Sequence, residues 1–207
     1  AYLSMARNTE LATLVRDTWH IRTLGNDVER QILAKYGSSL SEEDHWQRVD
    51  MLLWRGRLSD AESLMPRLSE GRRKLAVARL AVRRNRNGVD SFVQAVPAVY
   101  SDDPGLTHER ARWRERRGRD QGQLEMLLSV RGTDASEVGR EVIWREKHSE
   151  VRRLLREHQY QSAYQLTLDH GMIDGSGFRD AEWTAGWIAL TRLNDPIAAE
   201  GHFRKFG

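Results

Sequence analysis

A cluster of arginines around one tryptophan is the part of this sequence best suited to bind an anion. The stretch "ERARWRERRGRD" (109–120) surrounds Trp113 with Arg110, Arg112, Arg114, Arg116, Arg117 and Arg119. Guanidinium groups hold carboxylates and phosphates through charge-assisted hydrogen bonds. Because residues four apart share a helix face, Arg112 and Arg116 can present together to one anion. We therefore take Arg112, Trp113 and Arg116 as candidate substrate-binding residues.

The same cluster has a simpler interpretation as a solvated helix face. Glu109, Glu115 and Asp120 interleave with the arginines and can form ion pairs with them. A second basic stretch, "EGRRKLAVARLAVRRNRNG" (70–88), allows the same two interpretations. The whole chain has 33 Lys and Arg against 30 Asp and Glu, a formal charge of +3. This excess is mild, so nucleic acid is a less favoured partner.

Patterns typical of catalytic and metal centres are missing from the sequence. His108 and Glu109 begin an H-E-x-x-H pattern, but Arg112 stands where the second metal ligand is required. The chain has no cysteine, which excludes disulfides and thiolate chemistry. The glycines of "DGSGF" (174–178) follow no strand, and we expect a loop there. We predict no catalytic residue, no metal site and no cofactor.

Apolar residues recur at helical spacing along most of the chain. Ala61, Leu64, Met65 and Leu68 stand at i, i+3, i+4 and i+7, and other segments repeat this spacing. No stretch alternates convincingly as a strand. No apolar run approaches the roughly 20 residues that a membrane span requires. The pattern predicts an all-α protein without a membrane span.

Breaks between these helices recur at a regular interval. They fall near Gly56, Gly88, Gly118, Gln159 and Asn194, roughly 30 to 40 residues apart, which is the period of helical-hairpin repeats. Each hairpin can bury its apolar stripe by stacking on its neighbours. We therefore predict a single domain over 1–207, an α-solenoid of antiparallel helical hairpins that forms a U-shaped or ring-like superhelix.

The stretch "AEWTAGWIALTRLNDPIAAEGHF" (181–203) predicts one such hairpin. Trp183 and Trp187 stand four apart and share a helix face. Asp195 can cap a second helix, and Pro196 suits the first position of that helix. The segment is therefore expected to fold as two antiparallel helices.

Two interpretations of the tryptophan pair follow. In the favoured one, both indoles lie in the core, and Gly186 lets a neighbouring helix come close. In the other, an exposed indole stacks on a sugar ring while arginines pair with carboxylates. The second interpretation suits Trp113, which sits among arginines, better than it suits Trp183 and Trp187.

Two longer segments, 144–172 and 178–203, resemble the soluble lytic murein transglycosylase family in the helical region ahead of its catalytic domain. The residues that fit this pattern are Trp144, Arg145, His148, Leu154, Leu155, Tyr160, Ala163, Tyr164, His170, Gly171, Ala181, Glu182, Trp183, Gly186, Trp187, Ile188, Ala189, Leu190, Leu193, His202 and Phe203. Segments 16–84 and 103–117 also resemble the opening helices of that family. The resemblance spans nearly the whole chain.

The resemblance implies a periplasmic, superhelical region attached to a lysozyme-like domain. In the family, that domain cleaves the MurNAc–GlcNAc bond and forms a 1,6-anhydro sugar, using a glutamate in a Glu-Ser pair. Here Glu62 and Ser63 form such a pair, but no Gly-Leu-Met-Gln segment follows. We expect Glu62 to serve instead in a capping box with Ser59.

Three classes of function remain. The favoured class is the non-catalytic scaffold and substrate-guiding region of a longer peptidoglycan lytic enzyme, with its signal peptide removed and without activity of its own. Its expected partners are peptidoglycan glycan strands and a C-terminal lysozyme-like catalytic domain. The second class is a helical-repeat module for protein interaction. The third is a basic repeat protein that binds nucleic acid.

Overall fold

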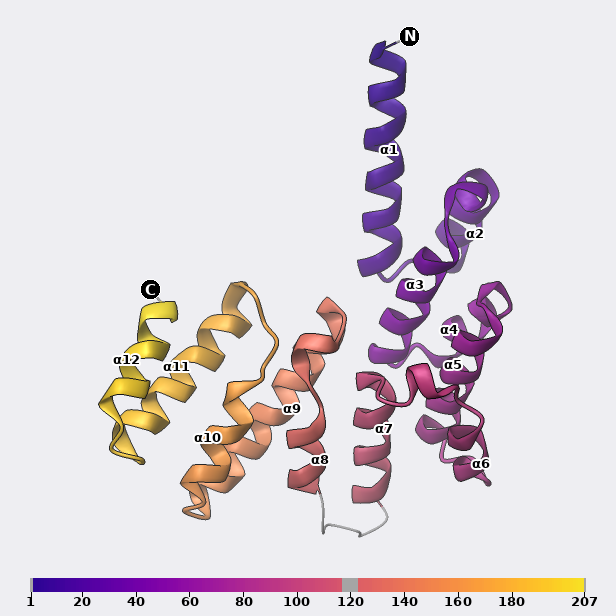
Figure 1. Cartoon of the computed structure of the whole chain (residues 1–207). Coiled ribbons are helices and arrows are strands. Elements are labelled where there is room, and N and C mark those ends of the chain that lie inside the picture. The colour runs from indigo at the N-terminus through magenta and orange to yellow at the C-terminus, as the bar shows by residue number, and fades with distance from the viewer. Residues whose placement is uncertain (1, 117–122, 207) are drawn as a thin grey trace. The chain divides into compact units, whose positions relative to one another are not determined.

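The computed structural model describes residues 2–116 and 123–206, and within them the chain forms α-helices and short 3-10 helices without any strand (Figure 1). The all-α prediction is therefore confirmed. Contacts divide the chain into two compact units, 1–100 and 101–207, which we describe separately. The arginines at 117 and 119 and the break at Gly118 lie outside the described residues.

The first unit contains six α-helices within the described residues. They are α1 (Tyr2–Ile21), α2 (Asn26–Tyr36), α3 (Glu42–Trp54), α4 (Leu58–Leu64), α5 (Glu70–Arg83) and α6 (Val89–Gln94), with 3-10 turns at Gly37–Ser39, Met65–Arg67 and Ala98–Tyr100. The predicted breaks at Gly56 and Gly88 are confirmed, since both glycines adopt positive φ, 74° and 73°, next to helix ends. Ser41 begins α3 with a capping box to Asp44.

Two arginines of this unit are core residues and not part of a solvated face. Arg48 is fully buried; it donates hydrogen bonds to Glu29 Oε2 at 2.6 Å and to the Trp19 carbonyl at 2.9 Å. Arg79, from the second basic stretch, is also fully buried and lies 2.6 Å from Asp50 Oδ1. Buried guanidinium groups of this kind need such partners, because an unpaired buried charge is costly.

The capping box expected at Ser59 and Glu62 is wrong. Helix α4 begins at Leu58, and Arg57 occupies the N-cap position without a side-chain cap. The Glu62 carboxylate instead forms an ion pair with Arg84 at 2.8 Å. The helix therefore starts two residues earlier than the box requires, and Glu62 pairs instead with the residue that follows the end of α5.

The second unit contains six further α-helices within the described residues. They are α7 (Pro104–Glu115), α8 (Gln123–Ser129), α9 (Glu137–Arg156), α10 (Tyr160–Leu168), α11 (Gly175–Thr191) and α12 (Pro196–Phe206), with a 3-10 turn at Gly132–Asp134. Helix α10 packs against α9 and α11, and α12 packs along α11 (Figure 1). The loop expected over 174–178 is wrong, because α11 already begins at Gly175.

The hairpin of α11 and α12 forms as predicted. The Asp195 carboxylate accepts a hydrogen bond from the Ala198 backbone N–H at 2.9 Å, and α12 starts at Pro196. A Cβ atom at Gly186 would come within 2.6 Å of the Phe203 ring, so the close approach expected at Gly186 is confirmed. A hydrogen atom in place of a side chain lets the two helices meet here.

The core position expected for Trp183 is wrong. Its side chain is 47% exposed, and Trp187 is only partly buried against a core cluster that includes Ile188. The residues of α11 that pack inward are mostly small: Ala181, Ala185 and Ala189, together with Ile188. Small side chains allow the neighbouring helices to approach closely, so Trp183 lies on the outer side of α11 and Trp187 at the edge of the core.

A buried lysine joins two turns of the second unit. Lys147 on α9 donates hydrogen bonds to the carbonyls of Val130 and Asp169, at 2.8 and 2.9 Å. Next to these carbonyls the backbones of the two turns are in contact: a Cβ atom on Gly171 would lie 2.1 Å from the carbonyl carbon of Gly132. Burial lowers the pKa of Lys147. The Lys147 ammonium group thus holds the two turns together through one hydrogen bond to each.

Candidate functional site

Arg112 lies in a polar groove of about 400 Å³ between α7, α8 and α9. We call it the Arg112 groove. Its lining consists of Ala111, Arg112, Leu127, Glu146, Ser149, Glu150, Arg153 and Arg156. Three of these side chains are cationic and two are anionic, so the groove can pair with carboxylates and ammonium groups in the same ligand.

Glu146 connects this groove to the interior of the unit. Its carboxylate lies 3.1 Å from Arg112 and 2.5 Å from the buried His108. Burial raises the pKa of Glu146, but the hydrogen bond with His108 and the positive charge of Arg112 help to outweigh burial and keep that pKa below its ordinary value. A carboxylate held ionised in this way is suited to accept hydrogen bonds and not to donate a proton.

The structure separates the three candidate binding residues. Arg112 lines the groove, and Arg116 is exposed at the C-terminal end of α7, one helical turn further along the same face. Trp113 points elsewhere, since only 9% of its surface is exposed. Any contact that this stretch makes with a ligand must therefore come from the arginines, and binding at the three residues stays a prediction.

A second polar cluster lies between α10, α11 and α12, and we call it the Glu182 cluster. Glu182 is buried on α11; its two carboxylate oxygens face His170 at 3.3 Å and His202 at 2.6 Å. Lys205 donates a third hydrogen bond, at 3.2 Å. His202 also meets the Tyr164 hydroxyl at 3.0 Å. One carboxylate thus gathers groups from three segments of the chain.

The hydrogen bonds of the Glu182 cluster fix its protonation. His170 Nδ1 accepts from the Met172 backbone N–H at 3.0 Å, so its Nε2 carries the proton and donates to Glu182. Burial lowers the pKa of His170, against the opposing effect of Glu182. Burial raises the pKa of Glu182, but its hydrogen bonds from His202, His170 and Lys205 outweigh burial and lower that pKa. A neutral His170 beside an ionised Glu182 satisfies every one of these bonds.

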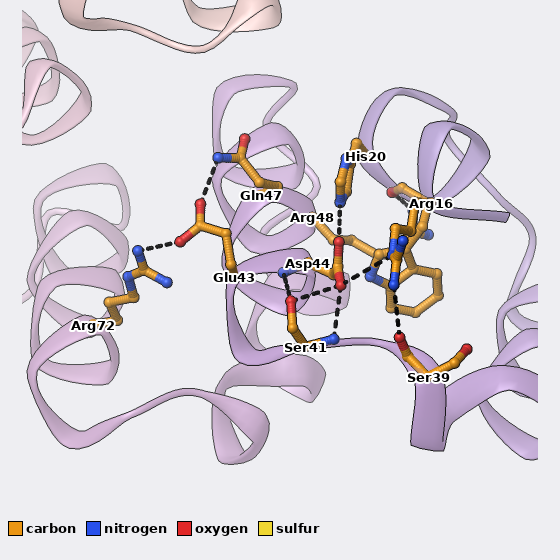
Figure 2. A network of polar contacts seen from close by, with 10 residues as sticks. Arg16, His20, Ser39, Ser41, Glu43, Asp44, Gln47, Arg48 and Arg72 are labelled. Atoms are coloured by element: carbon orange, nitrogen blue, oxygen red, sulfur yellow. Dashed lines mark hydrogen bonds and ion pairs between the residues drawn. The ribbon is translucent and has the colours of Figure 1, made fainter. Parts of the chain in front are cut away.

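The first unit brings a serine, an aspartate and a histidine together without the order of a catalytic triad. Figure 2 shows Asp44 between the other two: the Ser41 hydroxyl donates to Asp44 at 2.6 Å, and His20 Nε2 lies 2.9 Å from the other carboxylate oxygen. In a triad the histidine takes the proton of the serine. Here the aspartate separates hydroxyl from imidazole, and the cluster caps α3 and ties it to α1.

No group of three or more His, Asp or Glu side chains in the described part of the chain, residues 2–116 and 123–206, is arranged to hold a metal ion. None of its helices combines the length and the apolar character of a membrane-spanning segment.

Comparisons with known proteins give no match. No family model matches the chain, and neither a curated protein nor a solved structure is significantly similar to it.

Sequence reasoning missed most of the residues that surround the predicted ones. Glu146, Arg153 and Arg156 line the groove beside Arg112, but they belong to α9 and lie more than 30 positions away in the sequence. Their spacing in the sequence carries a partial signal, since Glu146, Glu150 and Arg153 share one helix face. The sequence of α9 alone does not tell that α7, with Arg112, packs beside this face.

Proposed function

We propose that this chain is a non-catalytic, helical-hairpin region of a periplasmic peptidoglycan lytic transglycosylase, which scaffolds the enzyme and guides its substrate. In this proposal the hairpins continue as an α-solenoid with a curved binding face. A lysozyme-like domain elsewhere in the enzyme would supply the acid glutamate for cleavage of the MurNAc–GlcNAc bond.

One observation carries the proposal: residues through which the chain resembles this family hold α9 to α12 together. His170 and His202 each form a hydrogen bond with Glu182 in the Glu182 cluster. Gly186 is in contact with Phe203. A resemblance based on such contacts supports a common packing of hairpins, because buried polar groups must find their partners in any chain that keeps them.

A second set of contacts, between α9 and α11, supports the same argument. The indole N–H of Trp144 donates to Asp180 at 3.1 Å, and His148 lies 3.0 Å from the same carboxylate. The Trp144 and His148 rings stack with centroids 5.1 Å apart. Both residues belong to the family pattern, and both fasten α9 to α11.

The proposal is tested with peptidoglycan sacculi. The 207-residue chain and the protein encoded by its complete natural reading frame are incubated with sacculi, and the soluble products are analysed by mass spectrometry. We expect 1,6-anhydro-muropeptides from the complete protein and none above the blank from the chain. Anhydro products from the chain alone, or no such products from the complete protein, would contradict the proposal.

The protein-interaction module is the second candidate, and one observation favours it. A shallow apolar hollow of about 410 Å³ lies on α11 and α12, lined by Leu190, Pro196, Ala199, Glu200, Phe203 and Arg204. Ile197 beside it is almost fully exposed. A helix of a second copy of this chain could cover such a surface. Failure of the sacculus experiment together with loss of self-association in Ile197→Asp, measured by sedimentation, would favour this second candidate.

A further inference from the structure

The outer face of α11 carries two parallel indoles. The Trp183 and Trp187 rings lie with centroids 6.4 Å apart and planes inclined by 12°. Trp187 is packed against the core cluster, whereas Trp183 is 47% exposed. Ile188 faces the core and stands five positions after Trp183, so the helix turns Trp183 away from the core, whereas Gly186, three positions after Trp183, lies beside it on the side that meets α12. One face of an indole is thus available to a ligand.

Cationic groups flank these rings. The Arg192 guanidinium lies 5.2 Å from the Trp187 ring centroid and 5.4 Å from that of Tyr160, so it sits over both rings. Arg179, which is exposed, precedes Trp183 by one helical turn on the same face. We call Arg179, Trp183, Trp187, Arg192 and Tyr160 the aromatic strip. It spans α11 and reaches the first residue of α10.

This arrangement matches the chemistry of an acidic sugar chain. A pyranose ring presents a face of C–H groups, whose hydrogen atoms carry a partial positive charge and are attracted to the negative face of an indole. A carboxylate carried by the sugar can pair with a guanidinium nearby. The Asp180 carboxylate faces α9, where it meets Trp144 and His148. The exposed arginines at positions 179 and 192 flank the indoles and complement the carboxylates of an acidic glycan, and this charge complementarity favours such a polymer as the occupant.

We propose that the aromatic strip binds a glycan strand of peptidoglycan, with an N-acetylhexosamine ring on the exposed face of Trp183 and a carboxylate of the strand at Arg179. This inference rests on the proposed function for the identity of the polymer. Arg192 holds the Trp187 and Tyr160 rings in place behind the contact. The site is separate from the Arg112 groove, since its residues belong to α10, α11 and the turn after α11.

The first experiment uses a neutral probe, the hexamer of N-acetylglucosamine. The 207-residue chain is titrated while its indole N–H resonances are followed by NMR. We expect saturable shifts, and about tenfold weaker binding for Trp183→Leu, which keeps an apolar side chain but removes the ring. Trp183→Phe should bind with intermediate affinity. Leu190→Ala is the matched control, because Leu190 is also 47% exposed on α11, and it should bind like the parent.

The second experiment tests the arginine. Soluble, uncrosslinked glycan strands with their stem peptides replace the neutral hexamer. Arg179→Ser should weaken binding of the carboxylate-bearing strands several-fold and leave binding of the neutral hexamer unchanged. Equal effects on both probes, or none on either, would refute the role given to Arg179.

The outcomes separate this inference from the proposed function. Hexamer binding that is absent from the parent chain, or equal in Trp183→Leu and the parent, overturns the strip even if the complete protein releases anhydro-muropeptides. Tryptophan-dependent binding sustains the strip even if the complete protein releases none. If Trp183→Leu abolishes self-association in sedimentation without affecting hexamer binding, the strip is a protein contact and the inference is wrong. Thermal unfolding of each variant identifies any loss of folding, and Trp183→Phe then provides the comparison.

Discussion

The imidazole of His202 lies 2.6 Å from the carboxylate of Glu182 and joins the last described helix to the centre of the second unit. Glu182 has only 5% of its side chain exposed, so water cannot replace this bond if it is lost. The relationship makes Glu182 the residue on which the packing of α10, α11 and α12 depends most.

Glu182→Gln should destabilise the second unit by about 2 to 4 kcal/mol, because the new amide N–H₂ faces donors and leaves buried groups unpaired. Urea unfolding followed by circular dichroism measures this. The matched control is Glu200→Gln on α12, where an exposed carboxylate pairs with Arg204 at 2.7 Å. That change should cost less than about 0.5 kcal/mol. Equal effects of the two variants would contradict the central role of Glu182.

The unfolding free energy should fall as the pH decreases from neutral. The folded chain lowers the pKa of His170 below its ordinary 6.5, so below that pH the unfolded chain binds more protons and is favoured. The pKa of Glu182 is lowered below 4.5, and its contribution is lost at still lower pH, as the folded carboxylate becomes protonated. His45 in the first unit acts in the same direction as His170, because burial lowers its pKa as well.

His170→Asn isolates the contribution of the second unit. The variant should be less stable at pH 7, yet its stability should change less between about pH 6.5 and 4.5 than that of the parent. One group accounts for at most about 1.4 kcal/mol per pH unit. Denaturant midpoints collected across this range measure both slopes. Parallel slopes in the two proteins would mean that His170 does not titrate as described.

Gly186→Ala and Gly201→Ala should have opposite effects. A methyl group at Gly186 meets the Phe203 ring at 2.6 Å, and the resulting overpacking should cost about 1 to 3 kcal/mol. At Gly201 on α12 an added Cβ has no neighbour within 4 Å among the described residues. Alanine there should stabilise the helix by about 0.5 to 1 kcal/mol. The melting temperatures of both variants are compared with that of the parent. A higher melting temperature for Gly186→Ala would contradict the prediction and show that α12 moves away from α11 at little cost.

Replacing Arg112 and Arg116 together by serine should reduce co-sedimentation with sacculi at low salt and barely affect folding. Exposed arginines contribute about 0 to 1 kcal/mol per contact, and salt screens them. The control replaces Arg30 and Arg57 by serine, which removes the same charge from the first unit. If both double variants sediment alike, the Arg112 groove has no special role. If the Arg112 and Arg116 variant unfolds, these arginines are structural.

The sequence located the hairpin of α11 and α12 but misjudged its faces. Asp195 and Pro196 act locally, so their effect on the start of α12 could be predicted. The periodicity of Trp183 and Trp187 identified a face of α11, and bulk alone suggested that it pointed inward. Close packing selected the alanine face instead, and this choice depends on neighbours that the local pattern does not contain.

The buried charges were beyond sequence reasoning for a related reason. Arg48 and Lys147 look like ordinary surface residues in amphipathic helices. Arg48 meets the carbonyl of Trp19, 29 positions earlier in the sequence, and Lys147 meets that of Asp169, 22 positions later. Only the folded chain supplies these partners. The same holds for the candidate site, where Arg112 was predicted but its partner Glu146 was not.

The contact between Gly132 and Gly171 restricts how this sequence can diverge. A side chain on either residue would press into the backbone of the other, and backbone cannot move aside as a flexible side chain can. Gly171 also has a φ of +67°, which other residues rarely adopt. Neither glycine can be replaced while the other turn stays where it is. In descendants of this chain, the two positions should be conserved as a pair, or change only when the turn between α8 and α9 is rebuilt.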